Sequence, residues 1–95
     1  MEKFKKEYQK EIKKMSMFIP IVSRVHGSSH EEFYEVEKLF NQIQLKISEN
    51  NYQIDKELTK LKQVTNNYEV PKDTCESYAY VYLTLEKLDS LYRFK

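Results

Sequence analysis

The sequence has 95 residues and a formal net charge of +1, so no overall field would draw the chain to nucleic acid or to an anionic membrane. A chain of this length forms one core, and we expect a single domain over residues 1–95. Cys75 is its only cysteine, which excludes an intrachain disulfide and a cysteine-rich zinc site. One glycine and two prolines are too few for the turns of a sheet protein, so the composition favours an all-α fold.

The apolar run at residues 15–22 contains Pro20 and follows a mixed lysine and glutamate stretch. It is far shorter than the ~20 residues that span a bilayer. It also lacks the layout of a secretory signal. We therefore expect a cytoplasmic protein with neither membrane nor nucleic acid as its partner.

Apolar side chains recur at three- and four-residue spacings over residues 2–25, which predicts an amphipathic helix. Pro20 should kink or weaken its last turns because proline cannot donate a helical hydrogen bond. Gly27 should end the helix as a flexible stop. The predicted inward stripe consists of Phe4, Tyr8, Ile12, Met15, Ile19 and Val22.

A second helix is predicted to begin at a capping box, with Ser28 paired to Glu31 or Ser29 paired to Glu32. It should fade over residues 48–51, where polar residues favour turns. Its inward stripe consists of Phe33, Val36, Phe40, Ile43 and Ile47.

A short third helix should end near residues 66–68, and a fourth should follow Pro71 with Asp73 as its N-cap and Glu76 as the capping partner. Short connections between amphipathic helices favour an up-down-up-down antiparallel four-helix bundle. The inward stripes of these two helices consist of Ile54, Leu58, Leu61 and Val64, and of Tyr78, Val81, Leu85, Leu88 and Tyr92.

This topology would gather His26, His30, Asp73 and Cys75 at one end of the bundle. The opposite end would hold the start of the first helix, the connection between the second and third helices, and the chain terminus. Lys5 and His26 would lie about 30 Å apart along a continuous helix. These two ends therefore cannot share a site.

Three segments resemble, in order, the hemerythrin-like di-iron proteins of the iron–sulfur cluster repair type. Residues 25–33 (VHGSSHEEF) are similar to the family's V-H-G-x-x-H-P-E-L, with Glu31 where the family has proline. Residues 65–78 (TNNYEVPKDTCESY) resemble T-N-x-Y…x-P-x-D-A-C-x-x-Y, and residues 85–90 (LEKLDS) resemble L-x-x-L-E-x-D. The resemblance covers nearly the whole chain. It implies a hemerythrin-like four-helix bundle with a di-iron site of histidine and glutamate ligands.

The end that would carry those ligands departs from the family pattern. Lys5 stands near the position of the first-helix histidine, and Asn50 and Asn51 stand where the family reads Glu-His. The family's H-x-x-x-E and H-x-H-I-x-x-E-N segments have no counterpart, and His26 and His30 are the only histidines. An ammonium and two amides cannot replace the imidazoles and bridging carboxylates of a di-iron site. The resemblance therefore implies the fold and argues against the family's iron chemistry.

A different metal site is an alternative at the other end, where His26 and His30 could bind one ion together with Asp73 and Cys75. In the alternative interpretation, His26 caps the first helix and His30 lies in the first turn of the second. Cys75 is either a thiol activated at a helix N-terminus or a small core-facing side chain. No nucleophile, base and orienting residue can be assembled, so we predict neither catalytic residues nor enzyme activity.

Two surfaces are candidates for contact with a partner. Residues 2–14 carry six lysines and three glutamates, a local charge of +3 that could meet an acidic partner, a membrane surface or nucleic acid, or simply face solvent. Tyr78 and Tyr80 cannot share a helix face, because two residues turn a helix by ~200°. We expect Tyr80 to point outward and to form a contact surface with Met17 and Phe18.

These patterns predict a non-catalytic, reduced hemerythrin-like bundle that acts through protein–protein contact, as a homodimer or with another protein, and without a cofactor. The alternative is a residual metal-binding protein related to iron–sulfur cluster repair, with iron as its metal. A third interpretation is an inactive relic of the family that keeps only its fold.

Overall fold

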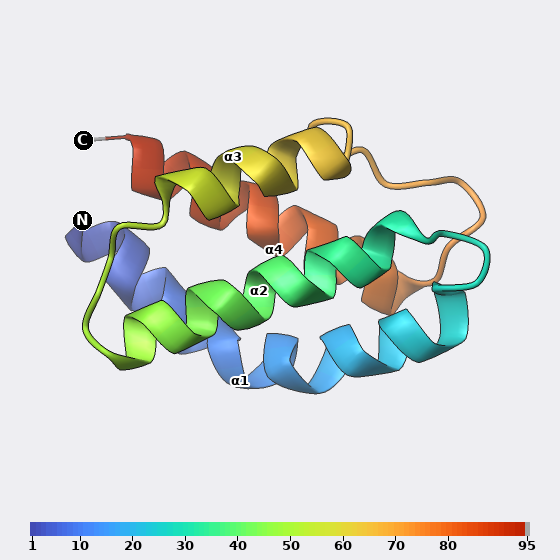
Figure 1. Ribbon diagram of the computed structural model, residues 1–95, viewed down its shortest axis with the longest axis horizontal. Helices are drawn as coiled ribbons and strands as arrows, with labels where there is room; N and C mark the ends of the chain where they lie inside the picture. The colour runs from blue at the N-terminus through green and yellow to red at the C-terminus, as the bar shows by residue number, and fades with distance from the viewer. Residues whose placement is uncertain (95) are drawn as a thin grey trace.

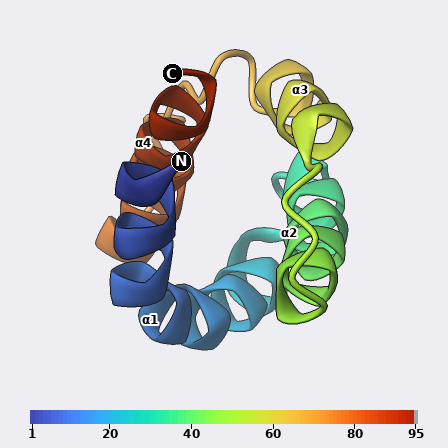
Figure 2. The ribbon, with the colours of Figure 1, turned by 90° about the vertical axis from the view of Figure 1, so that its left-hand side faces the viewer.

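The computed structural model describes residues 1–94, and over that range it contains helices and their connections but no strand. The four helices are α1 (Glu2–His26), α2 (Glu32–Ser48), α3 (Asp55–Val64) and α4 (Glu76–Arg93). Figures 1 and 2 show α1 beside α4 and α2, and α3 beside α2. The start of α1, the end of α4 and the α2–α3 connection lie at one end, called here the terminal end (Figure 1). The α1–α2 and α3–α4 connections lie at the other, called the loop end.

One hydrophobic core runs through the four helices and confirms most of the predicted stripes. Ile12, Ile47 and Val64 are only partly buried and pack against the core. Each fully buried large side chain contributes roughly 1.5–3 kcal/mol to folding. No helix in residues 1–94 combines the length and apolar character needed to cross a bilayer. The largest fully buried side chains are Tyr78, Tyr82, Phe4, Phe33 and Met15.

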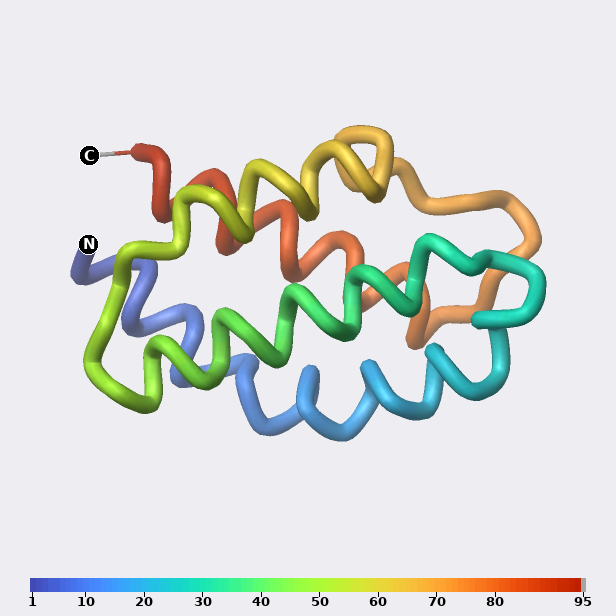
Figure 3. Tube along the Cα trace, viewed as in Figure 1, coloured from blue at the N-terminus to red at the C-terminus, as the bar shows by residue number. Residues whose placement is uncertain are grey.

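Helix α1 continues through Pro20 to His26, so the proline does not end it. Proline has no N–H to donate to the carbonyl four residues earlier, at Ser16. Figure 3 shows that α1 is bent along its length. The Ser16 hydroxyl accepts a hydrogen bond of 3.2 Å from the Gln44 amide, which joins α1 to α2.

Gly27 ends α1 as predicted, but the reason for a glycine differs from the predicted one. Its backbone is right-handed, with φ −58° and ψ −35°, so the conformational freedom of glycine is not used. A Cβ atom at this position would instead collide with the carbonyl oxygen of Ser23 and with the ring of Tyr34. Glycine is therefore favoured at this position because there is no space for a side chain, and not because of its backbone conformation.

We expect Gly27→Ala to lower the free energy of unfolding by about 1–3 kcal/mol, because neither a helix carbonyl nor the Tyr34 ring can accept the new methyl without displacement. Urea denaturation followed by circular dichroism measures this change. Ser29→Ala, at an exposed position in the same turn, should change the value by less than about 0.5 kcal/mol. Equal stabilities for Gly27→Ala and the parent chain would contradict the steric explanation.

The predicted helix caps are wrong. Helix α2 begins at Glu32 with Glu31 at the N-cap, and no side chain caps it. Cys75, not Asp73, is the N-cap of α4, again without a side-chain cap. The carboxylate of Asp73 instead lies beside the imidazole of His30, so a contact between two connections replaces the predicted local cap.

Candidate functional site

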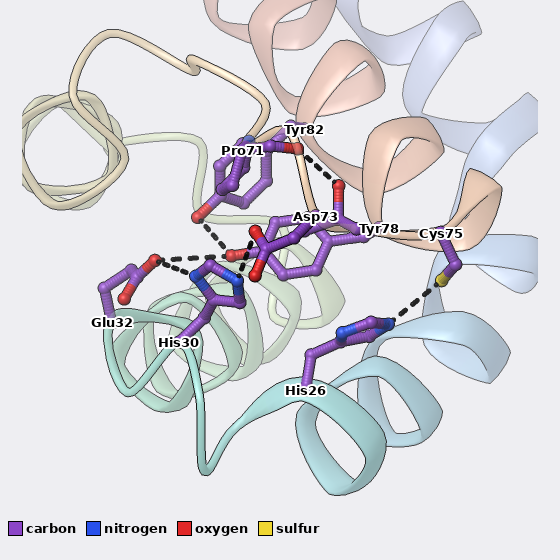
Figure 4. Close-up of polar contacts among 9 residues, drawn as sticks. His26, His30, Glu32, Pro71, Asp73, Cys75, Tyr78 and Tyr82 are labelled. Atoms are coloured by element: carbon purple, nitrogen blue, oxygen red, sulfur yellow. Dashed lines mark hydrogen bonds and ion pairs between the residues drawn. The ribbon is translucent and has the colours of Figure 1, made fainter.

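The loop end brings the four predicted candidate residues together as two separate pairs (Figure 4). In the first pair, His26 at the end of α1 places Nε2 3.3 Å from Sγ of Cys75, at the start of α4. In the second pair, Nε2 of His30 lies 3.0 Å from Oδ1 of Asp73. The first pair joins the end of α1 to the start of α4, and the second joins the α1–α2 connection to the α3–α4 connection.

Glu32 belongs to the same end, although its place in the sequence predicts only a helix-capping role. Its Oε2 lies 3.4 Å from Nδ1 of His30, so His30 has a carboxylate at each ring nitrogen. Glu32 follows His30 by two residues, and this spacing does not predict a contact between the two side chains. The backbone between them could adopt many conformations.

A structural zinc site takes four ligands that converge on one point, and a catalytic site takes three. Among residues 1–94, no three or more histidine, cysteine, aspartate or glutamate side chains are grouped so that they could hold a metal ion. The two pairs therefore act as links between chain segments that meet at the loop end.

Tyr78 of α4 packs against both histidines of the loop end. The rings of His26 and His30 meet the Tyr78 ring edge-on, with centroids 5.5 and 5.6 Å away. The Tyr78 hydroxyl lies 3.4 Å from Oε2 of Glu32, to which it donates, and 3.2 Å from the hydroxyl of Tyr82. Burial raises the pKa of Tyr78, and the contact with Tyr82 raises it further, so the phenol stays neutral.

Cys75 is exposed, so the interpretation of this residue as a core-facing side chain is wrong. It occupies the N-cap of α4 in an extended conformation, with its thiol beside the imidazole of His26. An exposed thiol at this position is open to modification from solvent, whereas a core thiol would be shielded.

We expect an aromatic disulfide reagent to label one thiol per chain in native buffer, because Cys75 is exposed and is the only cysteine. Release of the coloured thiolate measures the stoichiometry and the rate. A Cys75→Ser variant supplies the blank. Labelling that appears only after denaturant is added would show that the thiol is buried.

The terminal end is filled by aromatic side chains, which we call the aromatic plug: Phe4, Tyr52 and Tyr92. The Phe4 ring is 1% exposed, and its centroid lies 6.4 Å from that of Tyr52 and 5.3 Å from that of Tyr92. The Tyr92 hydroxyl donates to the carbonyl oxygen of Tyr52 at 2.5 Å and accepts from the backbone N–H of Ile54 at 3.3 Å. Nζ of Lys5 lies 4.6 Å from the centroid of the Tyr52 ring.

A buried carboxylate on α4 is also fully engaged. Asp89 is 3% exposed and accepts a 2.6 Å hydrogen bond from the Tyr68 hydroxyl at Oδ2. Its other oxygen pairs with the guanidinium of Arg93. Burial and the contact with Asp89 raise the pKa of Tyr68. Both oxygens of Asp89 therefore have partners within the protein.

The expectation that Tyr80 points outward with Phe18 is wrong. The two rings meet edge-on with centroids 5.5 Å apart, and both side chains are partly buried against the core between α1 and α4. The Tyr80 hydroxyl donates to Glu11, and Nζ of Lys14 lies 4.3 Å from the Tyr80 centroid. Burial and the bond to Glu11 raise the pKa of Tyr80 to about 12.

Helix α1 nevertheless exposes an apolar stripe, which we call the α1 stripe: Met17, Ile21 and Val25. Their exposed fractions are 57%, 40% and 62%. A spacing of four residues places them on one side of the helix. Leu83 of α4 is 57% exposed and follows Tyr80 by three residues, so it lies on the side of α4 nearest α1. Of the predicted contact surface, only Met17 is truly exposed.

Comparisons of the chain with protein-family models, with curated proteins and with solved structures each give no match. Three features of the described residues bear on function: the paired side chains of the loop end, the aromatic plug and the α1 stripe.

Proposed function

We propose that this chain is a reduced hemerythrin-like bundle, up-down-up-down and antiparallel, that binds a protein partner and catalyses no reaction. The observation that carries this proposal is the aromatic plug. Phe4, Tyr52 and Tyr92 occupy the end at which the resemblance would place the iron ligands.

The chemistry of the plug opposes iron binding. A di-iron site in a helical bundle uses histidine and carboxylate ligands that project inward from several helices. Here the Phe4 ring offers only hydrocarbon, and the Tyr92 hydroxyl is already engaged with two backbone groups. The Lys5 ammonium over the Tyr52 ring would repel a ferrous ion. These side chains support the proposal that the terminal end is packed by aromatic rings and does not bind iron.

The α1 stripe supports the second part of the proposal, binding of a protein. Single exposed apolar residues are normal on a protein surface. Three that follow one side of a helix, with Leu83 on the neighbouring helix, are typical of a contact site. A partner that covers these side chains would shield the exposed apolar surface of α1 from water.

Photo-cross-linking in cells tests this contact. A variant carrying p-benzoylphenylalanine at Met17 should form a covalent adduct with the partner on irradiation. The matched control carries the same residue at Gln63, an exposed position on α3, and should form none. Absence of any adduct from Met17 and from a second variant at Val25 would overturn binding through the α1 stripe.

The alternative is a residual metal-binding protein related to iron–sulfur cluster repair. Within residues 1–94, its support is the loop end, where His26 meets Cys75 and His30 meets Asp73. Each pair offers an ion only two donors, fewer than the three or four protein ligands of ordinary zinc sites. The geometry therefore favours the contact function over this alternative.

A further inference from the structure

We propose that the partner of the α1 stripe is a second copy of this chain, bound antiparallel about a twofold axis that crosses the middle of the stripe. This inference rests on the proposed contact function and names its partner. Two features carry it: the charge distribution along the molecule and the regular spacing of the stripe.

The chain separates its charge along its long axis. Residues 2–14, towards the terminal end, hold six basic and three acidic residues, which gives 6 − 3 = +3. Residues 24–32 and 65–76, at the loop end, hold two basic and five acidic residues, which gives 2 − 5 = −3 with histidine neutral. The acidic residues at the loop end are Glu31, Glu32, Glu69, Asp73 and Glu76.

An antiparallel pair about Ile21 places Lys10 and Lys14 of each copy, roughly 10–17 Å along α1 from the axis, opposite the acidic loop end of the other. Both contacts are then attractive, and by symmetry they are equal. A parallel pair would set like charges side by side at both ends. The charge distribution therefore favours a second copy in the antiparallel orientation over one in the parallel orientation.

Charged residues flank the stripe on the side where the contact would form. Lys10 is exposed and precedes Lys14 by four residues, and the ammonium of Lys14 lies over the Tyr80 ring at the α1–α4 boundary. Glu76 is exposed and precedes Tyr80 by four residues, so it lies on the same side of α4 as that ring. The face thus carries basic and acidic residues on opposite sides of its apolar centre.

The stripe is suited to a twofold contact because its three positions are evenly spaced. In an antiparallel pair, Ile21 meets the centre of the partner's stripe, and Met17 and Val25 exchange positions across the axis. The contact is apolar at its centre and charged at its ends, which is the usual division between the core and the rim of an interface.

The contact is short. Ile21 lies five residues before His26, the last residue of α1, which is ~8 Å along the helix, so a twofold axis there makes the two copies overlap mainly over their loop-end parts. Such a face is smaller than a standard interface, and we therefore expect a weak, reversible dimer.

Sedimentation equilibrium of the full chain over a range of concentrations tests the dimer. The average mass should rise from 11.6 kDa towards twice that value. Ile21→Glu and Met17→Glu should each weaken the dimer at least tenfold, because a charge would be buried at the apolar centre. The control is Leu45→Glu on α2, where a 62% exposed leucine lies outside the proposed face; it should leave the dimer unchanged. Circular dichroism melts verify that each variant folds.

A charge exchange tests the antiparallel orientation. One double variant carries Lys10→Glu and Lys14→Glu, and a second carries Asp73→Lys and Glu76→Lys. Each should weaken self-association at low salt, because like charges then meet across the contact. An equimolar mixture of the two variants should dimerise, because every contact across the heterodimer joins opposite charges. Failure of the mixture to associate would overturn the antiparallel pair.

A mass that stays at one chain up to millimolar concentration would overturn the dimer, as would loss of association in Leu45→Glu alone. Photo-cross-linking from position 17 separates this failure from that of the proposed function. An adduct with the mass of two chains supports the dimer. An adduct only with a different protein overturns the dimer and keeps the contact function, and no adduct overturns both.

Discussion

Replacing Phe4 with alanine should lower the free energy of unfolding by about 3–5 kcal/mol, the usual cost of emptying a large buried aromatic site. The Phe4 ring is 1% exposed and packs against Tyr8, Tyr52 and Tyr92, so its removal would leave a cavity at the terminal end. A domain of this size has a total stability of about 5–15 kcal/mol. The variant would therefore lose a large share of its stability, which urea denaturation measures.

Phe94→Ala is the matched control, because it removes the same side chain near the same end of the chain. Phe94 is 75% exposed, and its loss should change the free energy of unfolding by less than about 0.5 kcal/mol. A cost below about 1 kcal/mol for Phe4→Ala would contradict the aromatic plug, because a well-packed core does not tolerate such a deletion.

Raising the pH above about 10 should unfold the chain cooperatively, because several tyrosines are buried as neutral phenols. Burial raises the pKa of Tyr8 to about 12, and it also raises the pKa values of Tyr68, Tyr78 and Tyr82 above the ordinary value. Between pH 10 and 12 the folded chain therefore binds more protons than the unfolded chain. The stabilisation is complete below about pH 10, and each such group loses about 1.4 kcal/mol per pH unit above it.

Circular dichroism and tyrosinate absorbance, recorded on the same samples, test this prediction. Ionisation of the buried tyrosines should coincide with loss of helix. Tyr8→Phe supplies the control, since it removes one shifted group and should reduce the pH dependence by about 1.4 kcal/mol per unit. Ionisation of all eight tyrosines near pH 10 without loss of helix would contradict it.

The four helices were predictable because each carries an apolar stripe with helical spacing, as in the run from Phe4 to Val22. The N-caps of α2 and α4 were not predictable in the same way, because contacts distant in sequence compete with local capping. Asp73, the expected N-cap of α4, meets His30 from 43 residues away. Such contacts decide which residue begins a helix, and local sequence does not contain them.

The contact surface was mispredicted for a related reason. The spacing argument assumes that each helix has one buried face, so it places Tyr80 outward when Tyr78 points inward. Helix α4 also packs its flank against α1, where Tyr80 meets Phe18. A residue beside the buried stripe can therefore be half-buried by the neighbouring helix.

For the candidate site, the helix order was enough to place His26, His30, Asp73 and Cys75 at one end. It could not show how they pair, because the pairing depends on the backbone of two connections. The bond between Tyr68 and Asp89 was also missed, since nothing in the spacing of 21 residues indicates it.

The number of metal ions bound per chain distinguishes an aromatic plug from a metal centre. Mass spectrometry of the purified full chain, before and after anaerobic incubation with ferrous iron, counts the ions bound per chain. An aromatic plug at the terminal end predicts no stoichiometric metal under either condition. Two irons per chain would contradict the proposed function outright. One ion per chain that is lost in a His26→Ala/His30→Ala variant would also contradict it, and would place metal chemistry at the loop end.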